Sequence, residues 1–158
     1  MEKLDYAGLE KEITQQLRKA KELVLSTCAG GKVTARTMCH VNDGLTVLFS
    51  TDCRSGKVEQ MRQNPNIALT AGSLRIEARA ELFGHPGGHP AFGKAYAKKF
   101  PLLGKLYKPT PHDLLVICHP VKVSLYKYSG GPREDVLLPG ERKAYRMDLS
   151  VYDVETTL

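Results

Sequence analysis

The stretch that decides the fold is "KVTARTMCHVNDGLTVLFST" (residues 32–51), followed directly by "DCRSGKVEQMRQNPNIALTAG" (52–72). In the first segment, two runs of apolar and β-branched residues flank Asn42–Gly44, a sequence typical of a tight β-hairpin. In the second segment, a short run with helical spacing is followed by Asn64–Pro65–Asn66, where proline ends a helix and restricts the residue before it. We therefore expect strands over 32–41 and 45–50, a helix over about 55–63, and a further strand over 67–72.

The pattern outside this stretch also alternates between short strands and a few helices. Leu9, Ile13 and Leu17 repeat every four residues behind Asp5, a residue suited to cap a helix. Apolar and charged residues alternate over 73–84, as in an antiparallel strand with one buried and one exposed face. The further expected elements are a helix over 5–20, strands over 22–28, 73–84, 113–120 and 121–128, and a helix over 91–100.

Short strands joined mainly by tight turns, with one helix inserted after the third strand, predict a mainly β fold. We expect a six-stranded antiparallel β-barrel with peripheral helices, in a single domain that spans residues 1–158. The expected parts are an N-terminal helix (1–21), the barrel (22–128) and a C-terminal extension (129–158). In the extension the pattern is weak, and "VLLP", "RMDLS" and "VYDVE" predict no more than an edge strand and a tail.

The charge and the apolar content narrow the classes of partner. The formal net charge is +6, but lysine and arginine are spread along the chain, with their largest cluster in 94–108. No nucleic-acid-reading module accompanies that cluster, so we expect a solvated basic surface that attracts small phosphorylated ligands rather than a nucleic acid. No apolar run approaches the roughly 20 residues that span a bilayer, and the charged N-terminal segment lacks a signal-peptide core. We therefore expect a cytoplasmic protein without a membrane partner.

The cysteines and histidines do not form a metal-site pattern. The four cysteines lie far apart without a CxxC motif, which is typical of free thiols in a cytoplasmic chain. The histidines of "GHPGGHP" (84–90) and the Cys-His pairs at 39–40 and 118–119 lack the spacing typical of zinc ligands. We expect no bound metal.

Arg36, Ser55 and Lys57 lie on consecutive elements that fold back on one another. A phosphate monoester dianion requires several converging donors and at least one cation. Arg36 offers a guanidinium fork, Lys57 an ammonium and Ser55 a hydroxyl, while the first turn of the helix over 55–63 adds free backbone N–H groups. A lysine is poorly placed in a first helical turn unless an anion compensates it. Solvated surface side chains are the alternative for each residue, but the group together favours a bound phosphate.

The order of short motifs in this region resembles the pyridoxamine 5′-phosphate oxidase-like family, the FMN-binding split barrels. The motifs are "VTARTM", "LFST", "SGK", "NPNIALT" and "LRIEARAEL", in the family's order and spacing, within residues 22–83. The resemblance implies a six-stranded antiparallel split β-barrel that binds FMN. It also implies a homodimer, with one cofactor in each of two clefts at the interface.

The resemblance further implies a role for each matching residue. The implied cofactor-binding residues are Arg36, Thr37, Met38, Ser50, Thr51, Ser55 and Lys57. The arginine and the lysine would bind the FMN phosphate, and Ser55 would support the phosphate or the ribityl chain. Thr37 and Met38 would line the flavin, while Ser50 and Thr51 would hydrogen-bond the edge of the isoalloxazine ring.

The chain departs from pyridoxamine phosphate oxidase itself. Ser73 stands where that oxidase carries a glutamine, and the chain has no tryptophan for the oxidase's C-terminal substrate-binding motif. We expect a divergent member, an oxidoreductase whose FMN passes hydride or electrons to or from an unidentified small molecule. No residue is predicted to be a catalytic acid or base. Cys39, His40 and Tyr96 are the nearest candidates, and each has a structural alternative.

Two other functions stay open. The same fold can belong to a non-catalytic protein that stores or senses flavin, or that holds haem through one of His85, His89, His112 or His119 as an axial ligand. A deazaflavin with a similar phosphate site is a weaker option. A visible absorption spectrum separates these functions.

Overall fold

The computed structural model describes residues 1–150, and the segment "VYDVE" lies outside them. Within the described residues, ten strands form one sheet in which every pairing is antiparallel. The strands are β1 (Glu2–Lys3), β2 (Glu22–Ala29), β3 (Lys32–Cys39), β4 (Val41–Asp43), β5 (Thr46–Asp52), β6 (Asn66–Ala71), β7 (Leu74–Gly84), β8 (Asp113–Lys127), β9 (Arg133–Leu138) and β10 (Lys143–Asp148). They follow the order β1-β10-β9-β8-β7-β6-β2-β3, and β5 pairs with both β4 and β8.

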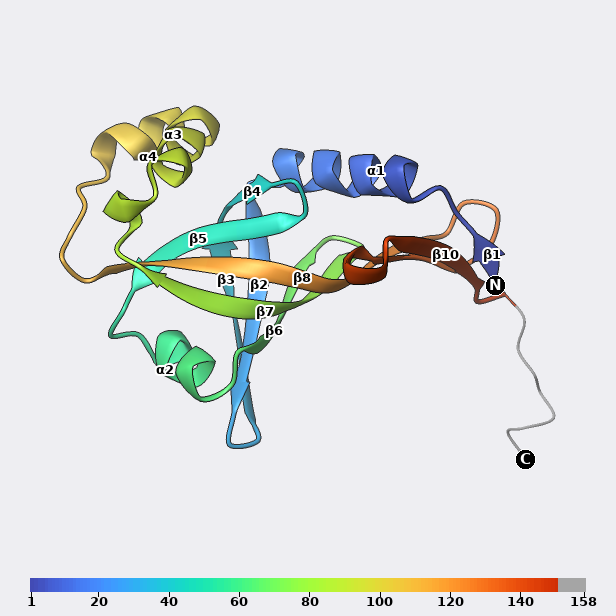
Figure 1. Cartoon of the computed structure of the whole chain (residues 1–158), viewed down its shortest axis with the longest axis horizontal. Coiled ribbons are helices and arrows are strands. Elements are labelled where there is room, and N and C mark those ends of the chain that lie inside the picture. The colour runs from blue at the N-terminus through green and yellow to red at the C-terminus, as the bar shows by residue number, and fades with distance from the viewer. Residues whose placement is uncertain (151–158) are drawn as a thin grey trace.

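The helices lie around the edges of this sheet (Figure 1). They are α1 (Tyr6–Lys19), α2 (Gly56–Gln63), α3 (Pro90–Lys99) and α4 (Pro101–Leu106). Figure 1 shows α3 and α4 at one end of the molecule and the β9–β10 hairpin at the other, with α1 lying across the face between them. Among residues 1–150, no helix is both long enough and apolar enough to cross a bilayer.

The sheet curls without closing, which makes it a split barrel. β3 pairs only with β2, while β5 continues the sheet from β8 instead of joining β3. The predicted fold class, a mainly β antiparallel split barrel with peripheral helices, is confirmed. The strand count differs from the expected six because the short β1 and β4 and the β9–β10 hairpin also join the sheet.

Two predicted strand boundaries were wrong, and one helix was missed. The strands expected over 113–120 and 121–128 form the single strand β8, because Pro120 lies at a register shift in the β7–β8 ladder, where its missing N–H is tolerated. The first strand of the quoted stretch ends at Cys39, and β4 begins only after His40. Helix α4 was not predicted, since its six residues are too few to show a period.

The helices near the barrel form for the reasons expected. The Asp5 side chain accepts a hydrogen bond from the Gly8 N–H at 3.0 Å and caps α1, whose Leu9, Ile13 and Leu17 are buried. Ser55 occupies the N-cap position of α2, and this helix buries Val58 and Met61 against the barrel.

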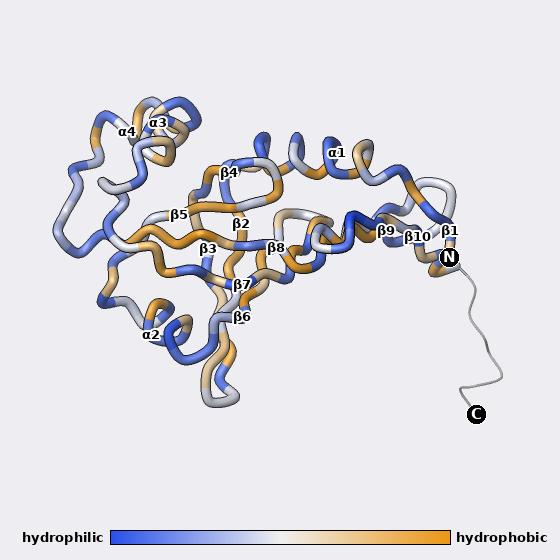
Figure 2. Tube along the Cα trace, viewed as in Figure 1, coloured by the Kyte–Doolittle hydropathy of each residue, from blue (hydrophilic) through white to orange (hydrophobic). Residues whose placement is uncertain are grey.

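Two apolar clusters hold the sheet and its helices together. The larger one fills the barrel between β2, β5, β6, β7 and β8 and the inner faces of α1 and α2. Figure 2 shows apolar residues concentrated along β5 and β8. A smaller cluster packs α3 onto the outer face of β5 and β8 through Leu48, Phe92, Phe100 and Leu115. The second cluster holds the α3–α4 segment at the rim, beside the ends of β3 and β5.

A buried carboxylate holds the far end of the sheet together. Asp135 on β9 is 1% exposed and accepts hydrogen bonds from Arg146 Nε at 2.7 Å and Nη2 at 3.1 Å. Its other partner is Lys127, whose Nζ lies 3.0 Å away and also donates to Glu12 of α1 at 2.8 Å. Burial alone would raise the pKa of Asp135, but the bonds from Arg146 and Lys127 hold it below its ordinary value.

We expect Asp135→Asn to lower the free energy of unfolding at pH 7 by about 3 kcal/mol, because it leaves two cations without their shared partner. The folded-state pKa of Asp135 lies below its unfolded value, so its contribution is complete above that unfolded value and is lost as pH falls. The gap between variant and parent should therefore shrink below about pH 4, as urea unfolding followed by circular dichroism will measure. The control, Glu141→Gln, alters an exposed pair and should change stability by less than about 0.5 kcal/mol. A gap that stays constant from pH 7 to pH 3 would contradict the assignment.

Candidate functional site

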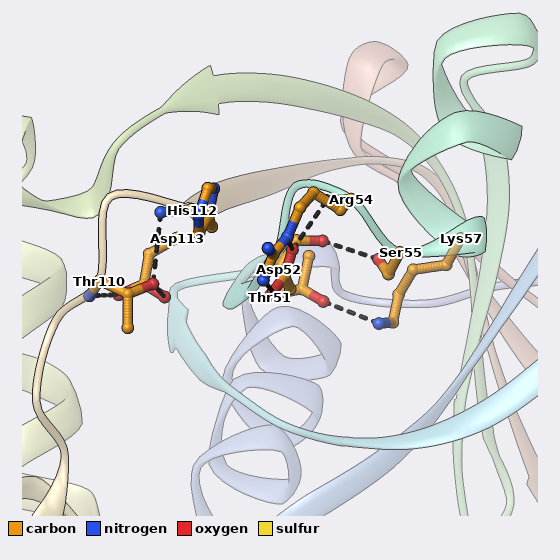
Figure 3. A network of polar contacts seen from close by, with 8 residues as sticks. All are labelled: Thr51, Asp52, Arg54, Ser55, Lys57, Thr110, His112 and Asp113. Carbon is orange, nitrogen blue, oxygen red and sulfur yellow. Dashed lines mark hydrogen bonds and ion pairs between the residues drawn. The ribbon is translucent and has the colours of Figure 1, made fainter.

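Arg36 of β3 and Lys57 of α2 lie at the split of the barrel, both half-buried. The Arg36 guanidinium donates to the carbonyl of Leu25 at 3.3 Å and to Thr27 Oγ1 at 2.8 Å, and it also donates to Thr34 Oγ1. Lys57 Nζ donates to Thr51 Oγ1 at 2.7 Å (Figure 3). Gln60, one turn after Lys57 in α2, accepts from the same two threonines that bind Arg36, and the charge of Arg36 lowers the pKa of Lys57. The structure therefore brings together the two cations that the sequence singled out.

The acidic surroundings of the two cations are sparse in the described part of the chain. Within residues 1–150, no carboxylate lies within ion-pair distance of Arg36 or Lys57. Burial lowers the pKa of both groups, and the charge of Arg36 lowers the pKa of Lys57 further, while Asp52 acts in the opposite direction. Two desolvated like charges disfavour each other, so an anion bound between them would relieve both.

The strand pairing explains how Arg36 reaches this position. Residues on β3 alternate, so Thr34, Arg36 and Met38 share one face. The β2–β3 register places Thr27 opposite Thr34, and both hydroxyls donate to Gln60 Oε1 of α2, at 2.6 and 2.7 Å. Gln60 thus fixes α2 against the β2–β3 hairpin, and the same threonines orient the guanidinium.

The turn between β5 and α2 positions Lys57. Ser55 Oγ donates to the carbonyl of Asp52 at 2.8 Å, and the Asp52 side chain pairs with Arg54 at 2.8 Å, as Figure 3 shows. Hydrogen bonds from Arg54 hold the pKa of Asp52 well below its usual range, so this carboxylate is already compensated. The first turn of α2 leaves the N–H groups of Gly56 and Lys57 without an acceptor inside the helix. These donors and the helix dipole favour an anion beside Lys57.

A pocket of about 240 Å³ lies beside Thr51, the residue that accepts from Lys57 Nζ, but neither Arg36 nor Lys57 lines it. On the barrel side it is lined by Met38 and Cys39 at the end of β3 and by Ser50 and Thr51 at the end of β5. Three of the predicted cofactor-binding residues therefore share one cavity. Thr37 differs, because its side chain is exposed on the opposite face of β3, so only its backbone lies on the pocket side.

The opposite wall of this pocket is aromatic and was not predicted. Phe92 and Tyr96 of α3 lie 5.8 Å apart between ring centroids, and Tyr107, just after α4, lies 6.3 Å from Tyr96. The Tyr107 hydroxyl donates to Asp113, and burial together with this bond raises the pKa of Tyr107 to about 12. The spacing of Phe92, Tyr96 and Phe100 on one helical face was the available signal, but only the packing of α3 shows where that face lies.

Of the three candidate acid–base residues, two line the pocket and one, His40, lies in the core. His40 is fully buried, its Nε2 lies 3.1 Å from the carbonyl of Leu17, and burial with the nearby Lys99 lowers its pKa to about 4. It stays neutral at physiological pH and has a structural place between α1 and α3. Cys39 and Tyr96, in contrast, line the pocket. In the part of the chain that the structure describes, no three His, Cys, Asp or Glu side chains converge as a metal site would require.

An open antiparallel barrel with two half-buried cations at its split defines a split-barrel class of protein. The sequence model of the family described as pyridoxamine 5′-phosphate oxidase matches residues 9–118, so the chain belongs to this family. A comparison with curated proteins gave no match.

Solved structures show the same fold at low sequence identity. Campylobacter jejuni ChuZ superposes with a TM-score of 0.75 at 17% identity, over 95% of this chain and 66% of that one. A pyridoxamine 5′-phosphate oxidase-related, FMN-binding protein from Nostoc punctiforme has a TM-score of 0.62 at 15% identity, over 96% of this chain and 100% of that one. The haem storage protein HutZ from Vibrio cholerae has a TM-score of 0.59 at 14% identity, over 71% of this chain and 89% of that one.

Proposed function

We propose that this chain is an FMN-binding oxidoreductase that exchanges hydride or electrons with a small molecule. The observation that carries the proposal is the pair Arg36 and Lys57, two half-buried cations that form no ion pair with a carboxylate of residues 1–150. Protein interiors rarely hold such a pair without an anion, because burial disfavours each charge. A terminal phosphate fits this donor set, since it accepts from a guanidinium, an ammonium and the free N–H groups of a helix start.

The rest of the cleft fits the ring of the same cofactor. The phosphate would lie between Arg36 and Lys57, and the isoalloxazine would extend toward Met38, with Ser50 and Thr51 as hydrogen-bond partners at its edge. The Thr37 backbone would line the flavin, and Ser55 would support the phosphate or the ribityl chain. When bound, FMN supplies the redox chemistry, while the protein's residues orient it and exclude water from one face.

The absorption spectrum of the purified protein tests the proposal. We expect the two visible bands of an oxidised flavin, and acid release of the cofactor followed by chromatography should identify FMN. A single intense Soret band would instead show haem, and one near-ultraviolet band typical of a deazaflavin would replace FMN with that cofactor. A colourless protein that takes up no added FMN would overturn the proposal.

The haem alternative rests on the likeness to HutZ and is less well supported by the histidines. His85 accepts from the N–H of Gly87 at 3.0 Å through Nδ1, while its Nε2 lies 2.9 Å from the carbonyl of Thr110. His89 caps α3 by accepting from the Phe92 N–H. His85 is therefore occupied, whereas His89 Nε2 forms no hydrogen bond within residues 1–150. Flavin remains the proposed cofactor because of the pair Arg36 and Lys57.

We also propose that two copies form a cytoplasmic homodimer and share the cofactor cleft. On the face of the sheet opposite Arg36, Val33 of β3 is 68% exposed and Val121 of β8 is 54% exposed. A shallow groove beside them is lined by residues of β2, β3, β6, β7 and β8. An apolar groove on the outer face of an open sheet is a natural surface for a second copy.

A further inference from the structure

The aromatic wall belongs to a cleft larger than the pocket described so far. A second pocket, of about 210 Å³, lies between α3 and α4 and shares Phe92, Tyr96 and Tyr107 with the first pocket of about 240 Å³. Each pocket alone is smaller than the roughly 300 Å³ at which ligand pockets usually begin. We call the two pockets on these shared rings the aromatic cleft: the pocket at the ends of β3 and β5 is the proposed isoalloxazine site, and the pocket at the α3–α4 segment is left for a substrate.

The charged side chains on this cleft are already engaged. Asp52 pairs with Arg54, and Asp113 accepts from Tyr107 and from the Thr110 N–H at 2.9 Å. His85 uses both ring nitrogens on backbone groups. Among the residues that the structure describes, no lysine or arginine lines either pocket. A ligand with its own charge would find no free countercharge there, so the cleft favours a neutral molecule.

Tyr96 is the polar group that remains available. It lines both pockets, and within residues 1–150 its hydroxyl forms no hydrogen bond. Burial raises its pKa, so the hydroxyl stays protonated and can donate. Its ring lies 5.0 Å from that of Phe100 and 5.8 Å from that of Phe92, which fixes its plane between two neighbours.

We propose that the aromatic cleft binds the substrate as a neutral, flat aromatic molecule that packs against Phe92 and Tyr107 and accepts a hydrogen bond from Tyr96. This inference rests on the proposed function, because it assigns the substrate class to the ring end of the FMN site. It differs from a substrate recognised through a phosphate or carboxylate, for which the cleft has no cation.

Binding of 2-naphthol tests this proposal, and 2-naphthol-6-sulfonate is its charged counterpart. We expect calorimetry and ligand-observed saturation-transfer NMR to show that 2-naphthol binds, and that the sulfonate binds at least about tenfold more weakly. Gly93→Leu should abolish binding, because Gly93 lines the second pocket and a side chain there meets open space. The matched control is Ala91→Leu, which adds a leucine to the exposed side of the same helix and should leave binding unchanged.

Tyr96→Phe separates the hydroxyl from the aromatic wall. It should weaken 2-naphthol binding roughly fivefold, since one hydrogen bond is lost while the ring remains. If 2-naphthol does not bind, if Gly93→Leu binds it as well as the parent, or if the sulfonate binds more tightly, the assigned substrate class is wrong. Measurements with and without FMN distinguish the two proposals. If only the substrate class is wrong, 2-naphthol does not bind but the flavin spectrum is intact. If only the FMN proposal is wrong, the flavin spectrum is absent but 2-naphthol still binds.

Discussion

The Arg36→Ala/Lys57→Ala double variant will purify without yellow colour and bind added FMN at least about 100-fold more weakly than the parent. Each substitution removes a charge-assisted contact to the phosphate, worth roughly 1.5–3 kcal/mol. The two cations come from different elements, β3 and α2, yet act on one anion. Equilibrium titration followed by quenching of FMN fluorescence will measure the loss.

A matched control comes from the same two elements. Lys32 begins β3 and Arg62 lies in the last turn of α2, and both side chains are exposed. Lys32→Ala/Arg62→Ala removes the same net charge, so it tests whether the effect is local or comes from the overall positive field. We expect its FMN affinity to stay within about threefold of the parent's. Equal losses in the two double variants would contradict the proposed phosphate site.

The flavin-free stability of the site variant provides an independent check. Burial lowers the pKa of Arg36 and of Lys57, so the folded, flavin-free protein disfavours both charges. Thr27 and Thr34 keep their shared acceptor, Gln60, when the guanidinium is removed. The flavin-free double variant should therefore melt no lower than the flavin-free parent, which separates loss of binding from loss of folding.

Local sequence signals predicted the elements nearest the site. The α2 start at Ser55 and the Asn-Pro stop after α2 depend on neighbouring residues alone, and both formed as expected. The expected hairpin also formed, but Asn42 and Asp43 belong to β4, and the turn residues are Gly44 and Leu45. The β9–β10 hairpin and the unbroken β8 depend on pairing across the sheet. In the sequence, Pro120 predicts the end of a strand. Only the register shift opposite it in β7 shows that the strand continues.

The site also combines residues that local sequence signals indicate with residues that only the fold brings together. Arg36 and Lys57 were singled out because a first-turn lysine is poorly placed without an anion and because the order of motifs resembles the family, and their role in binding FMN stays a prediction. Gln60 was missed because its role depends on two threonines of the β2–β3 hairpin that only the fold brings to it. Tyr96 was named only as an acid–base candidate and Tyr107 was not named, because they lie on α3 and after α4, beyond the quoted motifs, and packing alone places them at the pocket.

Val33→Glu/Val121→Glu should convert the proposed homodimer into a monomer. These side chains are 68% and 54% exposed on the outer face of the sheet, beside the groove between β3 and β8. In a two-fold symmetric dimer each substitution occurs in both copies, so four carboxylates would be buried without partners. We expect the dissociation constant of the dimer to rise at least about 1,000-fold, as measured by sedimentation equilibrium.

The control for this variant is Leu102→Glu on α4, which places one carboxylate at another apolar side chain that is 71% exposed. It should leave the oligomeric state unchanged, because it lies at the rim and not on the outer face. If the cofactor cleft is shared between copies, the monomeric variant will also lose FMN although Arg36 and Lys57 are intact. A monomeric variant that retains full FMN affinity would show that each chain builds its site alone. A parent protein that is monomeric at all concentrations would contradict the proposed dimer but would leave the proposed phosphate site unchanged.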